Sequence, residues 1–192
     1  MSGTSAPFGF RPAYHPSGMD RARKYTIASA YGTQIPKGAP VILNTNGTVT
    51  MGAAAADIMG VFAGCEYIDS TTGKPTVSTY WPAGQVATNI VAWVYDDPAE
   101  VFEVQADGSI PQTAVGDQTD VTNVASTTGS AAIGGNVLSA CTVSATLSGV
   151  GVQGQFRIVG FGQQVDNAPG DSFTIVQVQI ARHQFVSNKV AI

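Results

Sequence analysis

The sequence predicts an all-β protein: an antiparallel β-sandwich or barrel, jelly-roll-like, with an extended N-terminal arm. Three observations favour this class. Short runs of residues alternate between apolar and polar side chains, which is the period of a half-buried strand. Turn residues separate these runs about every ten residues. No segment shows the 3.6-residue apolar period of an amphipathic helix.

The predicted arm covers residues 1–24. Pro7, Pro12 and Pro16 disfavour a helix, so the chain should be extended. Because disordered tails are poor in aromatic residues, we expect the arm to lie on a surface, either its own domain or a neighbouring subunit. The side chains expected to make these contacts are Phe8, Phe10, Arg11, Tyr14 and His15. Deleting residues 2–18 should then leave a folded β-domain.

A single β-rich domain is predicted for residues 25–192. The strongest hairpin signal joins Val41–Asn44 to Thr48–Met51 through Asn46-Gly47, since Asn-Gly supplies the positive φ values that hairpin turns require. The remaining strand-like runs in the first half of the domain are Tyr25–Ser29, Ile58–Ile68, Val77–Trp81, Ile90–Tyr95 and Glu100–Gln105.

The second half of the domain begins with residues 113–136, which are rich in small polar residues and glycine and are predicted to form a long surface loop. Further strands are expected at Leu138–Leu147 and Phe156–Phe161. The final run, Ser172–Val186, is longer than an ordinary strand. It should either continue past the edge of its sheet or bend between two sheets.

The composition points to a protein that packs against other proteins. Only 11% of the residues are charged, against about 25% in an ordinary soluble domain. Residues 1–37 carry five basic residues and one acid, whereas residues 57–120 carry ten acids and one lysine. This asymmetry favours contacts between subunits, although the basic arm neutralising its own acidic body would explain it equally well. Nucleic-acid binding is not expected, because the basic residues are few.

The two cysteines, Cys65 and Cys141, lie in apolar runs and are predicted to be free, buried thiols. No apolar run approaches the roughly 18 residues that would span a bilayer. The N-terminus also lacks the charged and apolar regions of a secretory signal. We therefore expect no membrane partner and synthesis in a reducing cytoplasm.

No motif for catalysis, a cofactor or a metal stands out. The two histidines, His15 and His183, have no adjacent nucleophile and carboxylate that the sequence singles out. The acids Asp96, Asp97, Glu100 and Glu103 offer oxygen ligands for Ca²⁺, but their spacing does not match the EF-hand pattern. The simpler interpretation is a solvated turn followed by acids on the polar face of a strand. We expect a protein that is not an enzyme.

Three segments resemble the head decoration, or cement, proteins of tailed bacteriophages. They are PFGFRPAYHPSG near the N-terminus, IPKGAPVILNTNGTVTMG followed by IMGVFAGCEY, and the ending GDSFTIVQVQIARHQFVSNKVAI. The resemblance is one of pattern over most of the chain. It implies a β-rich protein that binds the outside of an icosahedral shell and bridges neighbouring capsid subunits. The family has no shared catalytic residues to transfer.

The expected function is therefore that of a structural virion protein that stabilises the capsid. Its expected partners are the major capsid protein and further copies of itself, as a homodimer or homotrimer, with no cofactor. The protein would be made in the bacterial host cytoplasm and reside on the capsid surface. The alternative is a carbohydrate-binding or adhesin-type module on a virion or fibre, for which Trp81 or Trp93 would have to be exposed in a cleft.

Overall fold

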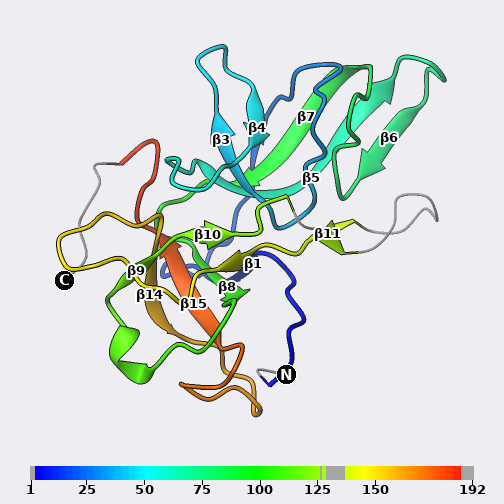
Figure 1. The fold of residues 1–192 in the computed structure, drawn as a ribbon. Coiled ribbons are helices and arrows are strands. Elements are labelled where there is room, and N and C mark those ends of the chain that lie inside the picture. The colour runs from blue at the N-terminus through cyan, green and yellow to red at the C-terminus, as the bar shows by residue number, and fades with distance from the viewer. Residues whose placement is uncertain (1–2, 126, 129–136, 187–192) are drawn as a thin grey trace.

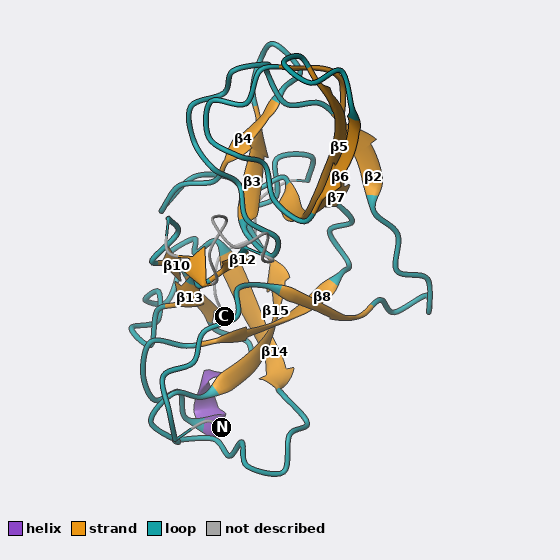
Figure 2. Ribbon diagram, turned by 90° about the vertical axis from the view of Figure 1, so that its right-hand side faces the viewer, coloured by secondary structure: helices purple, strands orange, loops and turns teal. Residues whose placement is uncertain are grey.

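The computed structural model of the chain describes residues 3–125, 127–128 and 137–186. It is built almost entirely of strands, and the predicted all-β class with antiparallel pairing is confirmed. Two main sheets stack one above the other (Figures 1 and 2). We call the part that contains residues 23–95 the upper lobe. The lower lobe consists of the N-terminal residues 3–14 together with residues 101–180.

The upper lobe is a six-stranded sheet in which β5 is the central strand. The order is β2-β7-β5-β3-β4, and β6 also pairs with β5. Its strands are β2 (Arg23–Tyr25), β3 (Pro40–Leu43), β4 (Val49–Met51), β5 (Gly60–Asp69), β6 (Pro75–Ser78) and β7 (Ala87–Tyr95).

This sheet curls until its two outer strands meet. Directly after β2, the carbonyl of Thr26 accepts a hydrogen bond of 2.8 Å from the N–H of Val49 in β4. Thr26 also forms a β-bridge with Thr48. Closing a sheet in this way satisfies backbone groups that would otherwise be exposed along two edges.

The lower lobe contains a five-stranded antiparallel sheet with the order β1-β8-β15-β14-β9. Its strands are β1 (Arg11–Tyr14), β8 (Val101–Gln105), β9 (Gln118–Thr119), β14 (Phe156–Phe161) and β15 (Ile175–Ile180). Two short ribbons complete it: β10 (Val121–Thr122) with β13 (Thr142–Val143), and β11 (Thr127–Thr128) with β12 (Leu138–Ser139). In the described part of the chain, the helical structure is one 3₁₀ turn, η1 (Gln112–Ala114).

Each lobe buries its own apolar cluster. The upper cluster includes Trp81, Phe62 and Cys65, and the lower one includes Phe102, Phe156 and Cys141. Both cysteines are free and buried, as the sequence predicts. Burial raises the pKa of each thiol to about 12, so both remain protonated and act as small apolar side chains.

The final strand-like run bends between the two sheets, which was one of its two predicted outcomes. β15 ends at Ile180, and the chain then turns towards the upper lobe. There the N–H of Ile58 donates to the carbonyl of Arg182 at 2.8 Å, and Ile58 forms a β-bridge with His183. The C-terminal run therefore links the lower sheet to the residues that lead into β5.

The surface loop predicted for residues 113–136 is not a loop throughout. Residues 126 and 129–136 lie outside the described part, but Gln118, Thr119 and Val121 are buried and belong to β9 and β10. The Gln118 side-chain oxygen accepts hydrogen bonds from the Gly154 N–H at 2.8 Å and from the Gln153 side chain at 3.0 Å. The buried Gln118 is tolerated here because its side-chain oxygen is paired inside the lobe.

Candidate functional site

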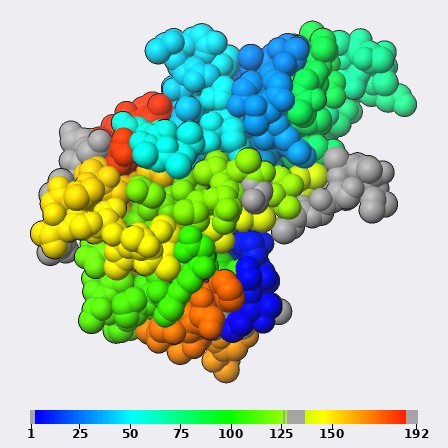
Figure 3. Space-filling view, viewed as in Figure 1, coloured from blue at the N-terminus to red at the C-terminus, as the bar shows by residue number. Residues whose placement is uncertain are grey.

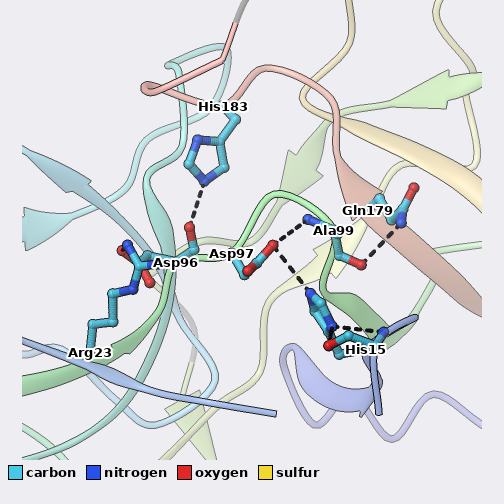
Figure 4. Close-up of polar contacts among 8 residues, drawn as sticks. His15, Arg23, Asp96, Asp97, Ala99, Gln179 and His183 are labelled. Carbon is cyan, nitrogen blue, oxygen red and sulfur yellow. Dashed lines mark hydrogen bonds and ion pairs between the residues drawn. The ribbon is translucent and has the colours of Figure 1, made fainter. Parts of the chain in front are cut away.

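One place where the two lobes meet is the connection between β7 and β8, residues 96–100, which we call the acidic turn. Asp97 organises it: its side chain accepts the N–H of Ala99 at 2.9 Å, and its carbonyl accepts the N–H of Glu100 at 3.0 Å. The Ala99 hydrogen bond, with a smaller contribution from His15, lowers the pKa of the Asp97 carboxyl. Figure 4 shows side chains from several segments that converge on this turn.

The acidic turn is less solvated than its sequence predicts. Asp96 is 2% exposed and Glu100 is 1% exposed, so the interpretation as a solvated turn is wrong for these two acids. The phenol of Tyr25 donates a hydrogen bond to Asp96, and the Arg23 guanidinium lies 3.4 Å from the same oxygen. From β15, the amide of Gln179 donates to the carbonyl of Ala99 at 3.2 Å.

Glu100 is the unusual member of the turn. Its Oε1 atom is buried and accepts no hydrogen bond among the described residues. Burial, and then the nearby charge of Asp20, raises the pKa of this carboxyl to about 7, although His15 acts in the opposite direction. A buried acid of this kind is protonated for a large part of its population near neutral pH.

The basic N-terminal segment folds back onto the acids of its own chain. Within the described residues, its ion-pair contacts include Arg11 with Glu103, His15 with Asp97 at 3.3 Å, and Arg23 with Asp96. β1 also pairs with β8 in an antiparallel register that places Arg11 opposite Glu103. Of the two explanations for the charge asymmetry, intramolecular neutralisation is the one that these contacts support.

Phe10 is part of the lower core. It is 2% exposed, and its ring centroid lies 4.4 Å from that of Phe156 and 6.3 Å from that of Phe102. Its N–H donates to the carbonyl of Gly38 at 2.8 Å. Phe10 is therefore not available as a contact residue for a partner, because its ring is already enclosed by its own domain. For the same reason, deleting residues 2–18 should not leave the domain intact.

Of the other expected contact residues, Phe8, Arg11 and Tyr14 remain at the surface, whereas the His15 side chain is 12% exposed and lies against Asp97. The Arg11 side chain is 57% exposed although it pairs with Glu103, and Tyr14 is 49% exposed. Phe8 is half-buried, with the Arg11 guanidinium 4.8 Å from its ring centroid. We call Phe8, Arg11 and Tyr14 the N-terminal ridge. In the space-filling view, the N-terminal residues lie on the surface of the lower lobe (Figure 3).

Two cavities lie against this ridge and share Phe8 and Arg11. The first, of about 440 Å³, is lined by Phe8, Phe10, Arg11, Pro12, Asp20, Lys37, Gly38, Tyr95 and Leu138. The second, of about 390 Å³, is lined by Ala6, Phe8, Arg11, Gln105, Gln164, Asp166 and Ile175. Aromatic walls with a few charged groups at the edge are typical of sites that receive a ligand or a side chain of a partner.

Both histidines have local partners. In His183, Nδ1 accepts the N–H of Phe185 at 3.1 Å, which leaves Nε2 to donate to the carbonyl of Asp96 at 3.1 Å. In His15, Nδ1 accepts the Ser17 N–H at 3.1 Å, and the Ser17 hydroxyl lies 2.6 Å from the same atom. Burial lowers the pKa of His183, which fits a neutral, structural imidazole.

His15 contacts Ser17 on one side and Asp97 on the other, as the histidine of a catalytic triad contacts its serine and aspartate. The contact between Ser17 and His15, however, is that of a local turn. The lone pair of His15 Nδ1 already receives the Ser17 N–H, whereas a general base needs that lone pair for the nucleophile's proton. Neither Ser17 nor His15 lines either cavity beside the ridge. Among the described residues, no three His, Cys, Asp or Glu side chains are close enough to hold a metal ion.

The two tryptophans have different positions. Trp81 is fully buried in the upper lobe. Trp93 lines a shallow surface groove of about 350 Å³, but the Lys24 ammonium lies over its ring, 5.0 Å from the centroid. A sugar stacks on the open face of an aromatic ring, and here a cation occupies one such face.

The burial of Asp96 and Glu100 was not predicted from the sequence. One signal was present: two adjacent acids and a proline stand between two strongly apolar strands, so the connection had to be short and close to both cores.

Comparison of the chain with protein-family models, with curated proteins and with solved structures finds no match. In the described residues, no helix has the length and apolar character needed to cross a membrane.

Proposed function

We propose that the protein is a structural component of a tailed-bacteriophage virion that binds the outer surface of the capsid and bridges neighbouring subunits. The observation that carries this proposal is the N-terminal ridge: Arg11 and Tyr14 are exposed on the paired strand β1, Phe8 lies beside the Arg11 guanidinium, and two cavities adjoin Phe8 and Arg11. The resemblance of the chain to head decoration proteins supports the same conclusion. On this proposal the major capsid protein is the partner, and no reaction is catalysed.

The ridge has the composition of a protein-binding surface. Aromatic residues and arginine supply most of the binding energy in protein interfaces. β1 fixes the backbone under Arg11 and Tyr14 through its pairing with β8, so little conformational entropy is lost when a partner binds. Many copies on one shell would also multiply a modest affinity for each subunit.

Carbohydrate binding is the second candidate, and one observation keeps it in view. Trp93 lines a groove together with the hydroxyl residues Ser78 and Thr79. The Lys24 ammonium over the Trp93 ring makes this site less suited to sugar stacking than an open ring would be. A glycan array probed with the purified protein separates the two candidates, because only the second one predicts a signal that depends on Trp93.

The capsid proposal is tested by co-sedimentation of the purified protein with capsids of the encoding phage that lack it. Replacing Tyr14 and Phe8 together by alanine should weaken binding by about 10–100-fold, the range for one or two interface anchors. The matched control is Phe185→Ala, since Phe185 is 53% exposed but lies outside the ridge. If the Tyr14 and Phe8 double variant binds as tightly as the control, the ridge is not the capsid contact.

A further inference from the structure

We propose that the outer face of the upper lobe binds a second copy of this chain, so that the protein forms a two-fold symmetric dimer. The face lies across β2, β7, β5 and β6, and we call it the Trp93 face. It consists of Lys24, Gly64, Glu66, Val77 and Trp93. The inference deepens the self-association included in the proposed function, but it uses none of the ridge residues.

The strand register places these side chains on one side of the sheet. Lys24 and Gly64 pair with Trp93 from either side, and Glu66 pairs with Val77. Residues that pair across strands point to the same face. The core lies on the other face, where Phe62 and Cys65 of β5 belong to the upper apolar cluster. The Trp93 face is therefore the outer surface of the lobe.

The face combines a groove with a neighbouring projection. The shallow groove beside Trp93 has small residues in its lining, namely Ala22, Ala63 and Gly64, and Val77 forms part of its wall. Gly64 has a φ of +150°, and a Cβ atom there would lie 3.0 Å from the Ser78 carbonyl oxygen, so the groove floor is fixed by the backbone. Val77 is 85% exposed, more than any other large apolar side chain described in the upper lobe.

A single exposed valine needs no explanation, but this one stands beside a half-buried tryptophan and an apolar groove. Such a surface is complementary to itself when one copy contributes Val77 and the other contributes the groove. Two-fold symmetry then forms the same contact twice, because a two-fold interface joins identical patches. The β5–β6 hairpin that carries Val77 lies at the outer edge of the upper lobe, away from the junction with the lower lobe (Figure 1).

The charges of the face also favour a second copy. Lys24 is exposed, and Glu66 is half-buried and has no ion-pair partner among the described residues. A two-fold rotation that brings Lys24 of one copy to Glu66 of the other forms that ion pair twice. A ligand with a strong charge of one sign would repel either Lys24 or Glu66, whereas an identical face pairs both side chains.

Analytical ultracentrifugation of the full chain tests the inference. The wild-type protein should sediment as a dimer at tens of micromolar concentration. Val77→Lys should weaken the dimer by at least about 30-fold, the effect of losing one strong interface contact, and should leave the circular dichroism spectrum unchanged because Val77 is exposed. The matched control is Val165→Lys, since Val165 is fully exposed on the lower lobe; it should remain dimeric.

A charge exchange distinguishes loss of this ion pair from a nonspecific effect of changing surface residues. Lys24→Glu alone should weaken the dimer, and the double variant Lys24→Glu with Glu66→Lys should restore it. A wild-type chain that is monomeric at all concentrations would overturn the inference, and so would a Val77→Lys variant as dimeric as Val165→Lys. A glycan signal that Val77→Lys abolishes would instead assign the face to carbohydrate. Capsid binding through the ridge is measured separately, so either proposal can fail alone.

Discussion

At the scale of single residues, Phe10 shows that the N-terminal segment is part of the folded domain. Its ring stacks on Phe156 inside the lower core, so removing the ring creates a cavity there. Phe10→Ala should lower the free energy of unfolding by about 3–5 kcal/mol. Urea denaturation followed by circular dichroism measures this change. Phe8→Ala, which removes a half-buried ring from the same segment, should cost clearly less; equal losses for the two variants would contradict this account.

Glu100 gives the protein a predictable dependence on pH. Because its pKa is raised from 4.5 to about 7 in the folded state, its contribution to stability is complete below pH 4.5 and is lost as the pH rises through 7. Because glutamine does not ionise, the Glu100→Gln variant does not lose this contribution as the pH rises. The variant should therefore gain stability relative to the wild type as the pH rises from 4.5 to 8, by about 3 kcal/mol in total.

Thermal denaturation of both proteins across this pH range measures the difference. Other carboxyls, including Asp97 with its lowered pKa, destabilise both proteins at lower pH and cancel in the comparison. A difference that stays constant from pH 4.5 to 8 would show that Glu100 is not the titrating group.

At the scale of elements, β1 is an integral strand of the lower sheet. It pairs with β8, and the segment just before it is tied to β8 by hydrogen bonds between Ala6, Thr4 and the buried side chain of Gln105. A chain that begins at Tyr14 should therefore be largely unfolded or aggregated. A chain that begins at Thr4 should fold like the full protein. Circular dichroism and size-exclusion chromatography distinguish these outcomes; a well-folded chain from Tyr14 would show that β1 is dispensable.

Strand positions that depend on local pattern were predictable from the sequence. The β3–β4 hairpin and β14 lie where alternation and the Asn-Gly turn indicated. The run Leu138–Leu147 instead forms two short strands, because β12 and β13 pair with different partners, β11 and β10. Val77–Trp81 is displaced as well: β6 ends at Ser78, and Trp81 turns into the upper core and bridges to Ile35. Pairing partners are long-range, so alternation alone does not identify them.

The candidate site was predictable only in part for the same reason. The sequence marked the aromatic and basic side chains of the N-terminal segment, and the structure leaves Phe8, Arg11 and Tyr14 at the surface. Whether such a segment binds its own domain depends on contacts about 90 residues away, such as Arg11 with Glu103. The burial of Glu100 likewise arises from the packing of two lobes, which no short window of sequence contains.

At the scale of the whole molecule, the curled upper sheet and the five-stranded lower sheet meet at a junction that includes the acidic turn, on which the N-terminal segment and the C-terminal run converge. This arrangement fixes the N-terminal ridge on the lower lobe and the Trp93 face on the upper lobe. Separate surfaces would allow one copy to contact a capsid subunit and a sister copy at the same time. Such a bridging role is what the proposed function requires.

The most direct test of that function is the composition of purified virions of the phage that, on this proposal, encodes the protein. Quantitative mass spectrometry should find this protein in intact particles at a fixed ratio to the major capsid protein, the same in independent preparations and in tail-less heads. A protein absent from virions, or present at a ratio that varies between preparations, would contradict the proposal that it is a structural component of the capsid.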